Sequence, residues 1–562
     1  MYIRTVRSKT TKGPVEYVQL CHNEHDPKTQ RSKTKVLYNF GRADELDVAG
    51  VRRLIGSLSR LLPPAEQKAI QEATGSTSSG LVFAGSRQLG GTWMLDKLWE
   101  RLGIRRVLRG LLRDRAYQTP MERLLFAMVA NRALAPASKL YVEHWLAEEV
   151  YVPGLPVVDV HQLYRAMDFL LENQEQIQEQ VYSSVANLLN LEVDLLFLDT
   201  TTTYFEVEEE DPDADRPGLR RRGYGKDNHP ELPQVVIGFA VTRDGIPVRC
   251  WVWPGNTSDQ EVIEEVKADL NSWRLGRVVM VQDTGFNSAG NRRLLQRAGG
   301  HYIIGEKMRL GRHGKPPEAL EQRGRFQTMA NGLEYKEAIV GGDSEARRRF
   351  VIVRNPEEAK RDREKRADIV QAVQSRLDAL QQLEGEPHRK AACALRSHAV
   401  FGRYIRQTQT GKLRLDKGKI RVEEHLDGKY LISTSDDHLP TEDVVLGYKQ
   451  LAEVERVFRD MKHVLELRPV RHRLADRIKA HVLLCWLGVL LVRVAETETG
   501  STWFQIKKTL ATIQLGILEF PDGVAHQSSK LTDRQKKLYK QVRVDPPPRF
   551  FSLQPGDQPM HF

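Results

Sequence analysis

Cysteine is scarce in this sequence. Four of the 562 residues are cysteine (Cys21, Cys250, Cys393 and Cys485), and no two of them form a C-x-x-C pair. Zinc ribbons and disulfide frameworks both need cysteines at paired spacings, so the sequence argues against either. The pattern fits a protein of a reducing compartment.

Long apolar runs are also missing. The N-terminal segment MYIRTVRSKTTKG has no apolar core of the kind that a signal peptide needs. The longest apolar run, Val482 to Val492, is shorter than the roughly 20 residues that a membrane-spanning helix takes. We therefore expect a soluble cytoplasmic protein that does not act at a membrane.

The charge balance is basic. The chain has 85 Lys and Arg against 74 Asp and Glu, a formal net charge of +11, with 40% hydrophobic and 28% charged residues. An ordinary globular protein has this hydrophobic content, and a polyanion-binding protein has this excess of cations. A mildly basic protein with no nucleic-acid partner has the same composition. The arginine-rich segment between Arg101 and Arg115 is equally open, since it could lie along phosphates or form a solvated helical face.

The apolar pattern changes along the chain. Three short strand-like runs fill residues 1–60, and a helical pattern follows from about 90 to 190. After residue 190, strands first pair in a hairpin and then alternate with helices, which predicts a mixed α/β sheet. A segment with short strands and a long charged helix interrupts this rhythm before further helices and a Pro-rich, loose tail.

Two aspartates follow apolar strands directly. Asp199 ends the run LLFLD before four threonines, and Asp283 ends VVMVQD before Thr284-Gly285. In α/β sheets, functional groups gather at the carboxyl ends of strands. Together with a carboxylate from a helix across the sheet, they could bind two divalent cations, a device for phosphoryl transfer. Taken singly, an aspartate in this position is more often a turn residue or a helix cap.

The third carboxylate, Glu455, lies in the helical pattern YKQLAEVERVFRDMK. Tyr448, Glu455 and Lys462 are spaced seven apart, which on a single helix displaces each by only about 20° from the last. Arg459 lies about 40° from Glu455 on the same face. Ion pairs at i,i+4 spacing would explain the charges of this face but not its tyrosine.

These positions resemble the Y-x2-R-x3-E-x6-K signature of the DDE transposases of bacterial insertion sequences, in the branch with a long β-rich insertion before the catalytic Glu. LDTTTTYFE, GYGKDNHPELPQVVIGFAV, PGNTSD, VVMVQDTGF and NRALAPASKL resemble the same branch, and the resemblance runs from about 120 to 490. One position departs from it. The signature Arg falls on Leu451, so either Arg459 substitutes for it or this branch manages without a cation there.

The resemblance implies an RNase H-like catalytic core whose metal ligands are Asp199, Asp283 and Glu455. It implies two Mg²⁺ or Mn²⁺ ions in each active site. Tyr448 and Lys462 map to positions that contact the transposon-end DNA, and the family-like GYGKD segment adds Tyr224 and Lys226 as expected DNA contacts. By its family, the protein would act on the nucleoid of a bacterial cell.

The expected organisation has six parts. They are an N-terminal β/α module (1–80), a helical DNA-binding region (81–190), the first part of the RNase H-like core (191–305), a β-rich insertion with a charged helix (306–428), the second part of the core with the Glu455 helix (429–498), and a C-terminal helical region with a tail (499–562).

The leading hypothesis is a transposase. It would cut double-stranded DNA at the ends of its element with metal-activated water and transfer the 3′-hydroxyl ends into target DNA, working as a homodimer in a synaptic complex. Two alternatives stay open. One is a host nuclease or resolvase of the same fold without strand transfer, and the other is a DNA-binding protein derived from a transposase that has lost its activity.

Overall fold

The chain folds into two compact units. In the computed structural model, unit 1 comprises Met1–Val185, His463–Leu467 and Arg471–Phe562, and unit 2 comprises Ala186–Lys462 and Arg468–Val470. The structure describes residues 2–10, 13–26, 31–43, 46–59, 61–62, 66, 82–113, 115, 119–155, 157–189, 191, 194–213, 218–227, 229–273, 278–309, 317–341, 347–520 and 523–555.

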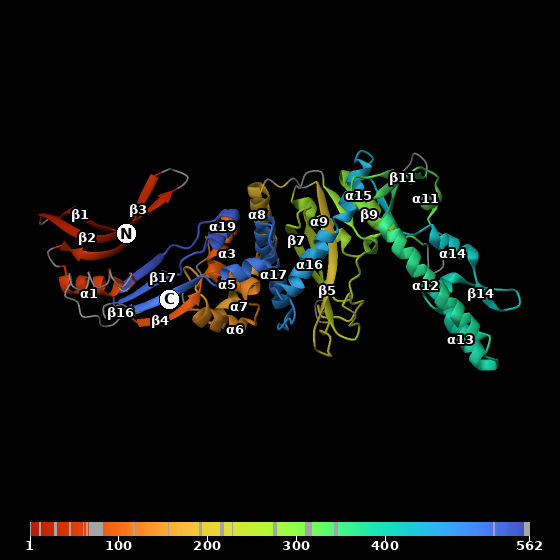
Figure 1. Ribbon diagram of the computed structural model, residues 1–562, viewed down its shortest axis with the longest axis horizontal. Helices are drawn as coiled ribbons and strands as arrows, with labels where there is room; N and C mark the ends of the chain where they lie inside the picture. Colours follow the sequence, from red (N-terminus) through yellow and green to blue (C-terminus); the bar gives the residue numbers. More distant parts are fainter. Residues whose placement is uncertain are drawn as a thin grey trace. The chain divides into compact units, whose positions relative to one another are not determined.

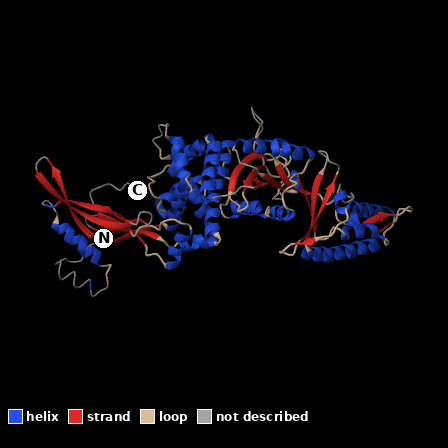
Figure 2. Ribbon diagram, turned by 90° about the horizontal axis from the view of Figure 1, so that it is seen from above, coloured by secondary structure: helices blue, strands red, loops and turns tan. Residues whose placement is uncertain are grey.

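A nine-stranded sheet organises unit 2 (Figures 1 and 2). Its first five strands in chain order are β5 (Leu195–Tyr204), β6 (Gln234–Val241), β7 (Pro247–Pro254), β8 (Val279–Gln282) and β9 (His301–Glu306). β5, β6 and β7 form an antiparallel meander, while β8 pairs parallel with β5 and β9 pairs parallel with β8. This order, β7-β6-β5-β8-β9, is the RNase H-like arrangement, and it confirms the predicted mixed α/β core.

Three strands of the insertion, β10 (Gln327–Thr328), β11 (Glu334–Val340) and β12 (Arg348–Arg354), extend this sheet. Beyond β9 the sheet continues with β15 (Lys429–Thr434), β12, β11 and β10, all antiparallel. The long charged helix that the sequence predicts from Asn355-Pro356 is present as α12 (Pro356–Leu380), with the Asn355 side chain capping its first turn.

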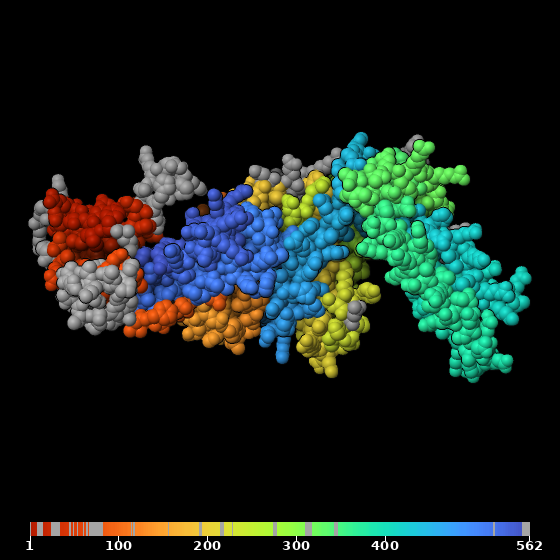
Figure 3. Space-filling model, viewed as in Figure 1, coloured from red at the N-terminus to blue at the C-terminus, as the bar shows by residue number. Residues whose placement is uncertain are grey.

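More of the insertion is helical than the sequence indicates. α11 (Glu318–Glu321), α13 (Gly385–Ser397), η5 (Phe401–Tyr404) and α14 (Lys417–Glu424) accompany the small hairpin of β13 (Ile405–Gln407) and β14 (Leu413–Leu415). Val373 and Leu377 of α12 pack with Leu395 and Ile405, so the apolar stripe of α12 contacts these neighbours. Figure 3 shows the green and cyan surface that α12, α13 and α14 form.

The segment around Glu455 is two helices and not one. α15 (Thr441–Lys449) ends before Leu451, and α16 (Ala452–His463) begins after it. The prediction that Tyr448 and Glu455 share the face of one continuous helix is therefore wrong. The break lets α15 and α16 pack independently on the sheet: a Cβ at Gly447 would lie 2.8 Å from Leu195 Cδ1, whereas Phe458 of α16 meets Phe239 at 5.6 Å between ring centroids.

Two further helices follow strands of the core. α9 (Ile263–Ser272) comes after β7, and α10 (Ala289–Gln296) connects the short helix η3 (Thr284–Phe286), which follows β8, with η4 (Arg297–Gly299) and β9. The Ser288 hydroxyl caps α10 by accepting a hydrogen bond from the Asn291 amide. α9 and α10 contact each other.

Unit 1 has a helical core. Its helices are α3 (Gly90–Arg101), α4 (Ile104–Leu112), α5 (Met121–Leu134), α6 (Lys139–His144), η2 (Trp145–Glu149), α7 (Val160–Glu172), most of α8 (Gln174–Leu189), α17 (Ala475–Thr499), α18 (Trp503–Leu510) and α19 (Asp533–Gln541). α17 is long and apolar enough to cross a membrane, but 94% of its apolar window is buried, and it packs against α5 and α7 as a core helix.

Two antiparallel sheets complete unit 1. The predicted N-terminal strands are present as β1 (Tyr2–Thr10), β2 (Gly13–Asp26) and β3 (Arg31–Arg42), followed by α1 (Val48–Ser59). The predicted C-terminal helices are accompanied by strands that the sequence did not indicate. β16 (Gln514–Phe520), β17 (Gly523–Ser528) and β18 (Phe550–Pro555) form a sheet with β4 (Val82–Gln88), so the segment expected to be a loose tail contributes a strand.

Candidate active site

Asp199 and Asp283 occupy neighbouring positions on two parallel strands. The last paired residues of β5 and β8 are Leu198 and Gln282, and each aspartate is the next residue along its chain. Adjacent strands lie about 4.8 Å apart, so the two side chains start from adjacent backbone positions. Asp199 does not end its strand as the sequence suggested. β5 runs on to Tyr204 because its β-branched threonines pair with β6.

Asp199 lies in a mostly buried, polar surrounding. Its Oδ1 accepts a hydrogen bond from the Thr200 backbone amide at 2.7 Å and lies 3.3 Å from Lys226 Nζ. Burial raises the pKa of Asp199 to about 6, although the Lys226 ammonium pulls the pKa in the opposite direction. Asp199 is therefore a carboxyl that titrates close to neutral pH and responds to cations placed beside it.

A further carboxylate, Asp259, takes part in the same cluster. Its Oδ2 lies 3.5 Å from Lys226 Nζ, and its Oδ1 accepts a hydrogen bond from the Thr200 hydroxyl. A Cβ at Gly285 would lie only 2.9 Å from Asp259 Oδ2, which places this carboxylate beside the segment that follows Asp283. The sequence reasoning missed Asp259, although it closes the PGNTSD segment that carried part of the family resemblance.

The hydroxyl of Tyr448 reaches the second aspartate. It donates a hydrogen bond to Asp283 Oδ1 at 3.2 Å, and its ring stacks on Tyr430 at 5.9 Å between centroids. Burial and the nearby Asp283 carboxylate both raise the pKa of Tyr448, so the phenol stays protonated. Gly305 makes this approach possible, because a Cβ there would collide with the hydroxyl and lie 2.7 Å from Thr284 Oγ1.

Glu455 is exposed in the first turn of α16. The described partners of Asp199 and Asp283, which are Thr200, Lys226 and Tyr448, form no hydrogen bond or ion pair with Glu455. The described residues also include no group of three His, Cys, Asp or Glu side chains close enough to hold a metal ion. The structure thus brings the two aspartates together with Lys226 and Tyr448, and leaves Glu455 facing solvent.

The position where the family signature has an arginine holds a buried leucine, Leu451. Leu451 is 8% exposed and lies in the break between α15 and α16. Arg459, the candidate substitute, is exposed on α16. Arg468, which follows α16 in the chain, is a different cation that shares the partner Asp227 with Lys462.

Lys462 is held by an acidic side chain from the GYGKD segment. Its Nζ lies 3.0 and 3.2 Å from the two carboxylate oxygens of Asp227, and Arg468 reaches the same carboxylate at 3.2 Å. The guanidinium of Arg468 also lies 4.9 Å from the centre of the Tyr204 ring. Asp227 therefore joins the segment after β5 to the end of α16 and neutralises part of the positive charge there.

Tyr224 and Lys226 of the same segment are both exposed but differ in their contacts. Tyr224 is 96% exposed, whereas the Lys226 ammonium donates to the Thr200 carbonyl at 2.7 Å and to the Thr200 hydroxyl at 2.9 Å. The first is accessible to a ligand, and the second is part of the carboxylate cluster.

Two carboxylates of the cluster are placed to contribute to a divalent metal site. Asp199 and Asp283 supply carboxylate oxygens, the ligands that Mg²⁺ and Mn²⁺ prefer. The Lys226 ammonium bridges Asp199 and Asp259, so a cation already has favourable contacts at this point.

The arginine-rich segment of unit 1 is partly neutralised within its own unit. Arg101 pairs with Glu498 at 2.7 Å, Arg105 with Asp96 at 2.6 Å and Arg115 with Glu172 at 2.9 Å. These three arginines are therefore held in ion pairs and do not form the solvated helical face that was one of the two expectations.

Two protein families match parts of the chain. Residues 215–491 match the family described as "Transposase DDE domain". This match identifies a DDE-type transposase, an enzyme that cuts DNA and transfers the cut strands. Residues 3–69 match a second family, "IS1634 family transposase, N-terminal domain". The chain belongs to the DDE transposases of bacterial insertion sequences.

The matched range takes in Asp283, Tyr448, Glu455 and Lys462 but begins after Asp199. No curated protein matches the chain. Among solved structures, a piggyBac transposase synaptic complex with hairpin DNA aligns with 77% of this chain and 82% of its own, at 10% identity and a TM-score of 0.33.

Proposed function

We propose that Asp199, Asp283 and Glu455 form the catalytic centre of this transposase and hold two divalent metal ions, Mg²⁺ or Mn²⁺. The observation that carries the proposal is the strand register, which sets Asp199 and Asp283 side by side. Bound metal would activate the attacking water or 3′-hydroxyl and offset the charge of the leaving oxygen. Glu455, exposed in the first turn of α16, supplies the third carboxylate.

The neighbouring side chains position the DNA. Tyr448 orients Asp283 through its hydroxyl, and exposed Tyr224 and Arg459 are available to the DNA backbone or bases. Lys226 and Lys462 offer ammonium groups that phosphate oxygens can share with Asp199 and Asp227. We place recognition of the element ends in the helical region 81–190, in particular on Arg106 and Arg113, which are exposed and form no ion pair within the described ranges.

The substrate is double-stranded DNA with the two ends of the element, and two ends call for a homodimer in the synaptic complex. The test offers pre-cut ends that carry a 3′-hydroxyl, together with a target plasmid and Mg²⁺. A transposase joins these ends to the plasmid, and chelation of the metal stops both cleavage and joining. Cleavage of uncut ends without any joining would favour a host nuclease, and binding without either reaction would favour an inactive DNA-binding protein.

Acid should inhibit cleavage through Asp199. Because burial raises its pKa to about 6, the carboxyl takes up a proton as the pH falls through that value, and a protonated carboxyl is a poor metal ligand. We expect single-turnover cleavage at limiting Mg²⁺ to decline below about pH 6. In Lys226→Met the cation that lowers the pKa is lost, so the decline should begin at higher pH. The check is a pH–rate profile of both proteins at saturating DNA, and coincident acid limbs would contradict it.

We expect the carboxylate of Asp227 to lower the affinity of the protein for DNA, because it offsets the positive charge of Lys462. Asp227→Asn removes one negative charge beside Lys462 and Arg468, a change of about 1 kcal/mol in their attraction for phosphate. Duplex affinity at low salt should rise about fivefold, and the salt dependence should steepen. Fluorescence anisotropy across a salt series measures both. Asp437→Asn, which removes the partner of Arg347 on an exposed pair, is the matched control and should change neither. An unchanged affinity of Asp227→Asn would be evidence against DNA contact at Lys462.

A further inference from the structure

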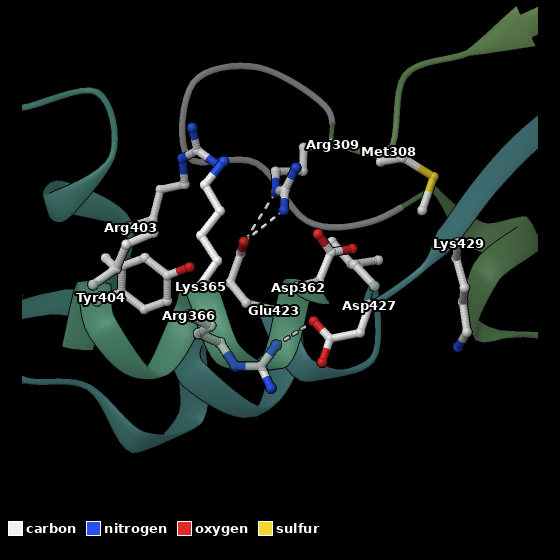
Figure 4. A pocket seen from close by; sticks show the side chains of 12 residues that line it. Met308, Arg309, Asp362, Lys365, Arg366, Arg403, Tyr404, Glu423, Asp427 and Lys429 are labelled. Atoms are coloured by element: carbon white, nitrogen blue, oxygen red, sulfur yellow. Dashed lines mark hydrogen bonds and ion pairs between the residues drawn. The ribbon is translucent and has the colours of Figure 1, made fainter. Parts of the chain in front are cut away.

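A polar cavity lies in the insertion, outside the carboxylate cluster. It has a volume of about 280 Å³ and is walled by α12, η5, α14 and the segments beside β9 and β15 (Figure 4). Pockets for drug-sized molecules span about 300–1,000 Å³, so this one suits a smaller ligand. Five cationic side chains line it against three carboxylates.

Each of the three carboxylates already has a partner. Glu423 accepts two hydrogen bonds from the guanidinium of Arg309, at 2.8 and 2.5 Å, and Asp427 pairs with Arg366. Asp362 Oδ2 accepts the Gly428 amide at 2.8 Å. Glu423 and Asp427 are neutralised by arginines, whereas Asp362 keeps its charge, which the remaining cations of the wall outnumber.

Three donors on the cavity wall have no such partner. Lys365 and Arg403 form no ion pair within the described ranges, and of the Arg403 nitrogens only Nε has a hydrogen-bond partner there, the Ala399 carbonyl at 3.0 Å. The hydroxyl of Tyr404, a residue only 5% exposed, has no hydrogen-bond partner among the described residues. In Figure 4, Lys365 and Arg403 extend to the same side of the cavity and the Tyr404 hydroxyl points inward.

We propose that this cavity binds a phosphate group through Lys365, Arg403 and Tyr404. A phosphate offers oxygens that accept from an ammonium, a planar guanidinium and a phenol at once, and its negative charge offsets the excess of two cations on the wall. The phosphate group can be part of a DNA backbone, or it can be a free phosphate ion. The cavity shares no residue with the proposed catalytic centre, so the site stands or falls independently of it.

The test uses the full-length protein and does not measure cleavage. Inorganic phosphate is titrated into wild type, Tyr404→Phe and the double variant Lys365→Gln/Arg403→Gln by calorimetry. We expect binding to weaken by about threefold or more in the first and at least tenfold in the second. In parallel, the affinity for a duplex is measured across a salt series. If the occupant is a DNA phosphate, the slope of log affinity against log salt should fall by about 0.9 in the double variant.

Lys360→Gln is the matched control, because Lys360 is exposed on the same helix and does not line the cavity. Loss of phosphate binding with an unchanged salt slope would assign the site to a free phosphate, and loss of both would assign it to DNA. An equal effect of Lys360→Gln would overturn the proposal, since the attraction would then be a general surface charge. Unchanged phosphate binding and salt slope in a double variant that melts at the wild-type temperature would overturn it as well.

Discussion

Replacing Asp283 by asparagine should abolish cleavage of element ends while end binding stays within about twofold of wild type. Asparagine keeps the shape and an oxygen that can still accept from Tyr448, but it removes the negative charge that a divalent metal needs. Loss of metal stabilisation is worth several kcal/mol in the transition state, so the rate should drop by about 10³-fold or more. Joining of pre-cut ends should fail equally, because both steps use the same centre.

Asp194 provides the matched control for this experiment. It directly precedes β5, and Arg243 holds it through two hydrogen bonds at 2.8 and 2.6 Å. Asp194→Asn removes a paired carboxylate from the same sheet without approaching the carboxylate cluster, so cleavage should persist. End binding is followed by gel shift and cleavage by single-turnover assay in Mg²⁺. An Asp283→Asn protein that cleaves at the wild-type rate would remove Asp283 from the catalytic centre.

The core of unit 2 was predictable because its signals are local. Apolar runs that end in Asp199 and Asp283 predict strands, and the alternation of strands with helices predicts a mixed sheet. Trp251 and Trp253 alternate with apolar neighbours, and both are buried, with their indole nitrogens bonded to Asp269 and Glu265. Nothing beyond a few neighbouring residues is needed for these inferences.

The features that escaped prediction depend on partners far along the chain. β4 pairs with β16, more than 400 residues later, so neither segment carries the pairing in its own pattern. The break between α15 and α16 is invisible in the sequence, since the residues around Leu451 keep helical spacing. It lets the two helices make separate contacts with the sheet, one through Gly447 and one through Phe458.

For the residues around the active site as well, the sequence indicates some features, and others depend on contacts between distant segments. Tyr448 was chosen from the family signature, but its contact with Asp283 depends on the helix break and on the lack of a side chain at Gly305. Asp259 contacts Lys226, and the sequence reasoning missed it although its segment carried part of the family resemblance. The sequence indicated which residues are candidates for the site. It did not indicate which of these residues contact each other.

Gly305→Ala should lower cleavage by about 10²-fold without unfolding the protein. Gly305 lies in β9, and an added Cβ would collide with the Tyr448 hydroxyl and lie 3.1 Å from the Thr284 amide, which is backbone and cannot swing away. Tyr448 must then leave Asp283. A catalytic group misplaced by about 1 Å costs on the order of 10²-fold, because the reacting groups lose their alignment.

Two further variants separate displacement from simple loss of a hydrogen bond. Tyr448→Phe deletes the hydroxyl and leaves α15 in place, so its defect should be smaller than that of Gly305→Ala. Gly290→Ala, in α10, adds a Cβ whose nearest neighbour is Ser288 Oγ at 3.8 Å, and it should cleave normally and melt slightly higher. Cleavage rates and melting temperatures of the three proteins distinguish displacement of Tyr448 from loss of its hydrogen bond. If Gly305→Ala cleaves like wild type, the contact between Tyr448 and Asp283 does not position the carboxylate, and the tyrosine must act on the DNA alone.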